Sequence, residues 1–301
     1  MTFRVILARS FLFGADPIYR CLYRLVVPAI VLVTISTAIM AAPRFWQPSS
    51  PGAGPATSPQ EFGRRGRRRG RVPNRDNYNN WKVAPQFRHD VFTFVRIQFD
   101  SGGYRRGPTW NNDYPDCDWN FSARLQELTS LEVDPNGIVL RLTDEALFDY
   151  PFIFMSNVQN LRLSPPEAEA LARYLLRGGF LMADDFWAPP AWEHVKEEMK
   201  RVFPDRQPVE LTADHAIFHL VYKLEGKPQV PSIFAWRQGD TFEYWHGDPQ
   251  GDTDPHFHGY FDDNDRLMAL FGHNNDIGDG WEREGENPEY FREYSERVSF
   301  P

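Results

Sequence analysis

The apolar residues in the C-terminal two-thirds of the chain form strand-like runs that alternate with helical spacing. Residues 92–100 (FTFVRIQFD) are rich in β-branched and aromatic side chains, which predicts a strand. Pro151–Asn157 and Gly179–Asp185 are nearly continuous apolar runs, as expected for strands that are buried on both faces. Shorter strands are predicted at Ile138–Leu142, Ile217–Tyr222, His256–Phe261 and Leu267–Phe271.

Helical patterns separate these strands. Asp118 can cap a helix with apolar positions at helical spacing, and residues 143–150 predict a helical turn. Ser164 and Glu167 form a capping box for a second helix, which ends at Gly178-Gly179, and a third helix follows Pro190. The predicted buried positions of the three helices are Phe121, Leu125 and Leu128; Ala168, Leu171, Leu175 and Leu176; and Trp192, Val195, Met199 and Val202. This alternation predicts an α/β fold, a flavodoxin-like three-layer domain with a mostly parallel sheet.

The first 90 residues have a different character. Residues 1–24 carry four arginines, and residues 25–42 are apolar, a combination that is typical of an export signal or transmembrane anchor. Residues 43–90 are rich in Pro, Gly and Arg, which predicts a disordered linker before a domain at 91–301. Positive charge before the apolar run predicts that the domain lies outside the cytoplasm, on the periplasmic side. It would be secreted if the signal is cleaved, and the sequence leaves cleavage open.

Charge narrows the choice of partners. Residues 1–89 carry a net charge of +11 and the rest −19, which gives −8 in total. An acidic domain repels phosphates, so no specific nucleic acid partner is expected. The expected partners are the membrane, through the N-terminal segment, and a protein. The chain has two cysteines, Cys21 and Cys117, and removal of residues up to about 42 would leave only Cys117, so no internal disulfide framework is expected.

Polar residues end two of the predicted strands. Ser156-Asn157 and Asp184-Asp185 would meet at the carboxyl edge of a parallel sheet, where ligands bind. One aspartate could face this crevice while the other caps the next helix. Asp184, Asp185 and His215 are the candidate catalytic residues, although a loop histidine is more often a structural hydrogen-bonding group. The candidate ligand-binding residues are Ser156, Asn157, His273, Asn275 and Asp276.

A histidine pair offers a different chemistry. His256 and His258 would share one face of a strand, as two metal ligands must, and they lie in a stretch rich in aspartate. The spacing matches no defined zinc or calcium motif, so a solvated acidic loop is the alternative. The sequence contains no G-x-S-x-G, P-loop or C-x-x-C motif and assigns no cofactor.

Several ordered segments together resemble the bacterial domain-of-unknown-function family 4159 from about Phe92 onward. They are FVRIQFDSGG, YPDCDWNF, LTDEALFDYPFIFMSN, LSPPEAEALARYLLRGGFLMADDFW, FP before ADHAIFH, and DDNDRLMALFGHNNDIGDGWE. The resemblance implies a class I glutamine amidotransferase-like fold. It also implies a further strand and helix after Pro301, and a segment similar to DHAIF in related proteins suggests a carbohydrate-related role.

The resemblance also marks one departure. In amidotransferases a cysteine occupies the sharp turn that here holds Asp184-Asp185, and Cys117 lies in an early loop instead. We therefore expect an accessory domain that binds a ligand or partner. The alternative is a hydrolase-type enzyme that uses Asp184, Asp185 and His215.

Overall fold

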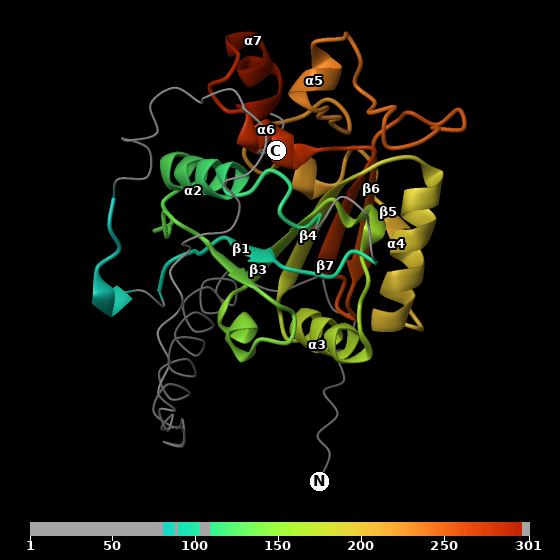
Figure 1. Ribbon diagram of the computed structural model, residues 1–301. Helices are drawn as coiled ribbons and strands as arrows, with labels where there is room; N and C mark the ends of the chain where they lie inside the picture. Colours follow the sequence, from blue (N-terminus) through green and yellow to red (C-terminus); the bar gives the residue numbers. More distant parts are fainter. Residues whose placement is uncertain (1–80, 88–89, 103–108, 297–301) are drawn as a thin grey trace, which may run out of the picture. The chain divides into compact units, whose positions relative to one another are not determined.

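The computed structural model describes residues 81–87, 90–102 and 109–296 (Figure 1). The predicted segments 1–24 and 25–42 and most of the linker 43–90 lie outside these residues. Among the helices of the described part, none has the length and apolar character needed to cross a membrane.

Seven strands form one sheet in the order β2-β1-β3-β4-β7-β6-β5. The strands from β2 to β7 in this order are parallel, whereas β6 runs antiparallel to both β7 and β5. Their bounds are β1 Val95–Ile97, β2 Ile138–Leu140, β3 Phe152–Ser156, β4 Phe180–Phe186, β5 Val209–Glu210, β6 His256–Phe261 and β7 Leu267–His273. The predicted α/β fold with a mostly parallel sheet is therefore confirmed.

Helices cover both faces of the sheet (Figure 1). Their bounds are α2 Asp116–Leu128, α3 Pro165–Leu176, α4 Pro189–Val202, α5 Ile233–Trp236, α6 Ile277–Glu282 and α7 Pro288–Tyr290. Ile153 packs with α3 and α4 in one core cluster, whereas its neighbour Phe154 packs with α2 and α6 in another. This division follows from the alternation of side chains along a strand.

Shorter helical segments complete the described chain. They are 3-10 turns at Pro85–Phe87, Glu145–Asp149, Val158–Asn160 and Ala216–His219, and a π-helical turn at Phe291–Ser295. The turn at Glu145–Asp149 lies within the helical turn that the sequence predicted for residues 143–150.

Three local predictions are wrong. Ile217–Tyr222 is not a strand, because only Phe218 is fully buried and Leu220 is 71% exposed. Leu176 is exposed rather than buried, because it lies on a different side of the last turn of α3 from its buried neighbour Leu175. Asp118 does not cap α2, which begins at Asp116.

Asp118 instead forms a buried ion pair that ties α2 to β1. Arg96 Nε donates to Asp118 Oδ1 at 2.9 Å, and both side chains are buried. Burial lowers the pKa of Arg96, but the charge of Asp118, its hydrogen bond and the charges of Cys117 and Asp113 together outweigh burial, so the pKa rises and the guanidinium stays charged. Arg96 Nη1 also donates to the carbonyls of Trp110 (3.1 Å) and Asn112 (3.0 Å). The pair therefore fixes the loop that follows β1.

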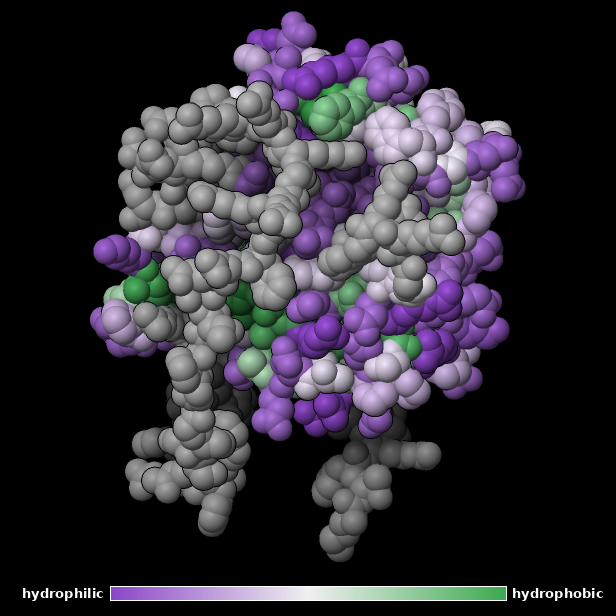
Figure 2. Space-filling model, viewed as in Figure 1, coloured by the Kyte–Doolittle hydropathy of each residue, from purple (hydrophilic) through white to green (hydrophobic). Residues whose placement is uncertain are grey.

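Hydrophilic residues cover most of the described surface on the face in Figure 2, and apolar residues form small patches. Tyr244 and Trp245 are each 55% exposed.

Candidate functional site

The predicted strand ends lie side by side where the parallel strands have their carboxyl ends. Ser156 in β3 is the register partner of Asp184 in β4, and Asn157 N donates to the carbonyl of Asp184 at 3.1 Å. Phe186 pairs with Asn275, which follows β7. The structure therefore brings together Ser156, Asn157, Asp184 and Asp185, as the sequence predicted, and adds the loop after β7.

Asp185 lies in strained backbone at an irregularity near the end of β4. Its φ of 54° lies in the left-handed region that non-glycine residues rarely adopt, and its side chain is 1% exposed. Its Oδ2 accepts from the amides of Asn112 (2.7 Å) and Asn157 (2.9 Å), and Oδ1 accepts from the indole of Trp187 at 3.1 Å. Burial raises the pKa of Asp185 to about 6, although the charge of His246 opposes the shift.

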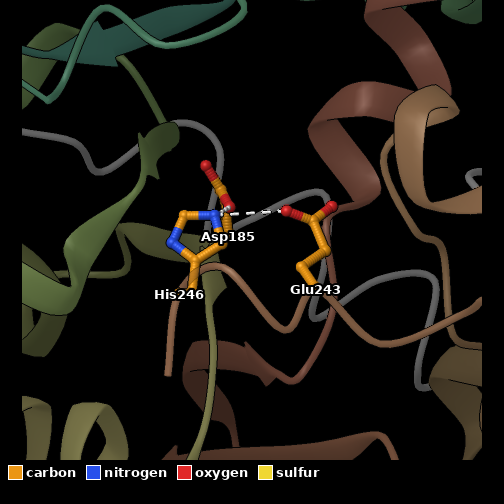
Figure 3. Close-up of side chains that lie close together, drawn as sticks. All are labelled: Asp185, Glu243 and His246. Atoms are coloured by element: carbon orange, nitrogen blue, oxygen red, sulfur yellow. Dashed lines mark ion pairs between the residues drawn. The ribbon is translucent and has the colours of Figure 1, made fainter. Parts of the chain in front are cut away.

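Two residues from the loop before β6 face Asp185 (Figure 3). His246 Nε2 lies 3.2 Å from Glu243 Oε2 and 3.9 Å from Asp185 Oδ1. Burial alone would lower the pKa of His246, but the hydrogen bond to Glu243 and the charge of Asp185 raise it above its usual value. Glu243 is anchored from behind, because its Oε1 accepts from Ser232 N at 2.6 Å.

Asp185, Glu243 and His246, which we call the histidine group, can each offer one ligand atom to a metal ion. These atoms all lie within 4.8 Å of one another. Two carboxylates and an imidazole suit zinc, manganese or iron. Three protein ligands also leave a coordination position open for water or a substrate, as in catalytic zinc sites.

Asp113, Asp276 and Asp279 form a second set, which we call the aspartate group. Their ligand oxygens also lie within 4.8 Å of one another, and all three side chains are buried. Burial, together with the charges of neighbouring carboxylates, raises the pKa of each residue well above its usual value.

Asp184 lies beside the aspartate group rather than at the start of α4. Its Oδ2 accepts from Gly278 N at 2.8 Å, and burial raises its pKa well above the usual value. The N-cap of α4 is Ala188, and no side chain caps that helix. The expectation that one of the two aspartates caps the next helix is therefore wrong.

His215 does not join the two aspartates. It caps the 3-10 turn at Ala216–His219, and its ring lies 6.3 Å from that of Phe261. Phe261 pairs with Leu267 at the start of β7. The start of β7 lies at the opposite end of the parallel strands from Asp185. The predicted grouping of Asp184, Asp185 and His215 is wrong, because the sequence did not reveal that β6 runs antiparallel.

The other predicted ligand-binding residues divide into two kinds. Asp276 belongs to the aspartate group, and Ser156 Oγ donates to Asp113 Oδ2 at 3.3 Å. Asn275 braces a loop instead, because its Oδ1 accepts from Val230 N at 3.0 Å. His273 Nε2 lies 3.0 Å from the Ala188 carbonyl and thus supports the turn before α4.

The predicted metal ligands His256 and His258 share a face of β6, but each has other contacts. The ring nitrogens of His256 lie 2.9 Å from Glu210 Oε1 and 3.1 Å from Asp252 Oδ1. His258 stacks on Trp192 with a centroid distance of 3.9 Å. Within the described residues, neither of the two metal-capable groups includes these histidines.

The model of one protein family, described as Domain of unknown function (DUF4159), matches residues 93–300. This chain belongs to the DUF4159 family. The matched range includes every member of the histidine group and the aspartate group. No curated protein matches the chain.

Sequence reasoning missed four functional candidates of this DUF4159 domain, namely Asp113, Glu243, His246 and Asp279. One signal was available, because Glu243-x-x-His246 has the spacing by which di-metal carboxylate proteins present two ligands together. Here the spacing is realised in a turn, where His246 N donates to the Glu243 carbonyl at 3.0 Å. Asp113 carried no comparable signal, because nothing in its loop indicated that its side chain would contact Ser156 at the end of β3.

Proposed function

We propose that the DUF4159 domain binds a divalent metal ion through the histidine group. The single observation that carries this proposal is the convergence of Asp185, Glu243 and His246 from two distant segments. Two buried carboxylates beside one imidazole are costly to keep charged, and a metal ion offsets that cost.

A neighbouring amide can prepare His246 for this role. The Gln159 side-chain nitrogen lies 2.9 Å from His246 Nδ1. A 180° rotation of the Gln159 side-chain amide exchanges its nitrogen and oxygen. The oxygen then lies beside His246 Nδ1 and accepts a hydrogen bond from Nδ1–H. That tautomer leaves Nε2 free to bind the metal, and metal-bound histidines usually have such an outer partner.

A relation to the class I glutamine amidotransferase-like proteins is part of this proposal. The order β2-β1-β3-β4 is that of the first four strands of a flavodoxin-like sheet. Asp185, at the irregularity near the end of β4, stands where those proteins carry a cysteine, and Cys117 is buried with a raised pKa. A buried, protonated thiol is a poor nucleophile, so we favour an accessory, ligand-binding role over glutaminase chemistry.

A metal-dependent hydrolase is the second candidate function. It is favoured by the three-ligand set, which leaves a position for a metal-bound water, and by the partial exposure of His246. Hydrolysis of nitrophenyl phosphate, nitrophenyl acetate or a nitrophenyl glycoside by the metal-loaded chain, lost after chelation and in His246→Gln, supports this candidate. Equal rates before and after chelation contradict it.

We further propose that residues 25–42 hold this domain at a membrane, outside the cytoplasm. The support is the apolar run behind a positive flank in the sequence. Protease added to intact spheroplasts should digest the domain of the full chain. Protection from that protease contradicts this placement.

Metal analysis of the purified full chain tests the main proposal. We expect bound Zn²⁺ or Mn²⁺ after dialysis, and a higher Tm when the metal is added to chelated protein. His246→Gln and Glu243→Gln should each weaken binding more than about 100-fold, since even outer partners contribute 10- to 100-fold.

The matched control is His256→Gln, which removes a histidine that also lies between two carboxylates. It should leave metal binding unchanged. If His256→Gln abolishes binding while His246→Gln does not, the metal lies at the β6 histidines and the proposal is wrong.

A further inference from the structure

We propose that the aspartate group is a second cation site, with Asp184 as its fourth oxygen donor. It takes a divalent cation that prefers oxygen ligands, such as Mg²⁺ or Mn²⁺. The site shares no residue with the histidine group, so each of the two proposals can be tested independently of the other.

The three aspartates converge from two segments that are far apart in sequence. Asp113 follows β1 with a φ of 61°, and Asp276 and Asp279 belong to the start of α6. Asp276 Oδ1 accepts from Asp279 N at 2.8 Å, and Asp279 Oδ2 accepts from Ile233 N at 3.0 Å. Backbone donors therefore hold the carboxylates in place without neutralising them.

Asp184 supplies the independent observation. Its side chain is fully buried, and its Oδ1 has no hydrogen-bond partner among the described residues. A buried carboxylate oxygen without a partner is costly, and such groups are rare in folded proteins. Asp184 Oδ2 lies beside Asp113 and Asp276, so a cation held there would compensate the charge of this carboxylate.

Gly278 shows that three of the four carboxylates share one space. A Cβ atom added at Gly278 would lie 3.3 Å from Asp113 Oδ2, 3.4 Å from Asp276 Oδ1 and 3.7 Å from Asp184 Oδ2. Three carboxylates thus surround a position at which the chain has only a hydrogen atom. A larger residue would occupy the space in which the oxygens meet.

Two arginines near this space are paired mainly with other acidic groups. The charge of Arg96 lowers the pKa of Asp113 and Asp184, but its ion pair is with Asp118. Arg283 Nε lies 3.6 Å from Asp279 Oδ1 but is closer to Glu282 Oε2, at 2.9 Å. Within the described residues, Asp113, Asp184 and Asp276 form no ion pair with lysine or arginine. A divalent cation therefore meets a net negative site that is already assembled.

The two groups are neighbours. Asn112 Nδ2 donates to Asp185 Oδ2 at 2.7 Å and lies 3.2 Å from Asp113 Oδ2, and Asp184 and Asp185 are consecutive. Two cations bound here would sense each other magnetically. This gives a readout that a merely structural role of the aspartates would not produce.

Titration of the chelated full chain with Mn²⁺, followed by electron paramagnetic resonance and by equilibrium dialysis, tests the inference. We expect two ions per chain and a spectrum broadened by coupling between them. Asp113→Asn and Asp184→Asn keep their hydrogen-bond acceptors and should each retain one ion, with the six-line signal of an isolated Mn²⁺. His246→Gln should retain one ion at the aspartate group.

Asp262→Asn, at the turn between β6 and β7, is the matched control and should bind two ions. Circular dichroism shows whether each variant is folded. If Asp113→Asn is unfolded, Asp184→Asn provides the test of the site. One ion in the wild type that His246→Gln removes overturns the second site and leaves the proposed function intact. If the wild type binds one ion that His246→Gln keeps and Asp113→Asn removes, the aspartate group is a cation site and the proposed function is wrong. Two ions in both aspartate variants also overturn the second site.

Discussion

At the scale of single residues, part of the site could be predicted and part could not. Ser156, Asn157, Asp184 and Asp185 were predictable, because parallel strands place polar ends at a common edge. Glu243 and His246 lie in a long loop without periodic structure, so their approach to Asp185 depends on tertiary packing. His215 was misplaced because the sequence did not reveal that β6 runs antiparallel.

The β6 histidines give a prediction at this scale. Burial lowers the pKa of His258 to about 4, so the folded chain resists a proton that the unfolded chain accepts below about 6.5. The stability that His258 provides is complete above that pH and is lost as the pH falls towards 4. His258→Phe keeps the stacking on Trp192 but removes this dependence.

We expect the free energy of unfolding of His258→Phe, relative to the wild type, to rise by about 2 kcal/mol between pH 7.5 and pH 4.5 in urea titrations. His256→Gln should behave in the opposite way. Hydrogen bonds to Glu210 and Asp252 raise the pKa of His256, so its contribution is present at low pH and is lost as the pH rises. Parallel pH profiles for His258→Phe and the wild type would contradict the assignment.

At the scale of elements, α3 and α4 were predictable because their apolar spacing and end signals agree. Ser164 N and Oγ both donate to Glu167 Oε2, at 2.8 and 2.6 Å, as the capping-box sequence indicated. By contrast, β5, α5 and α6 have two to six residues each, too few for a period to be seen. The apolar run at Ile217–Tyr222 misled because most of it lies at the surface.

The junction between α3 and β4 gives a prediction for these elements. A Cβ atom at Gly179 would lie 2.3 Å from the Tyr174 ring, which is held by a bond from its hydroxyl to the Tyr150 carbonyl at 2.9 Å. Gly179→Ala should therefore lower the free energy of unfolding by about 1–3 kcal/mol in urea. Gly226→Ala, with nothing within 4 Å of the added atom, should change it by less than about 0.5 kcal/mol. Equal effects of the two substitutions would refute this account of the packing.

At the scale of the whole molecule, the fold class followed from the sequence but the strand order did not. Alternating strands and helices required a parallel sheet, and β1 to β4 obey this rule. The insertion of β7 between β4 and β6 left no trace in the pattern, because an apolar strand reads the same at the centre of a sheet as near its edge.

The central place of β7 gives a prediction at this scale. A chain that ends at Asp262 lacks the strand that joins β4 to β6, and it should show no cooperative thermal unfolding transition in circular dichroism. A chain without residues 1–66 loses no described residue and should keep the transition. A cooperative transition in the chain that ends at Asp262 would mean that β4 and β6 can complete the sheet without β7.

The late position of this strand also affects synthesis in the cell. Translation completes β4 long before its partner β7 leaves the ribosome, so for that interval an apolar edge with unpaired backbone groups is open to wrong neighbours. Such a nascent chain benefits from a chaperone that keeps it extended until its last third has been made. Export in an unfolded state would impose the same delay, and the domain would then assemble only after it had reached its destination.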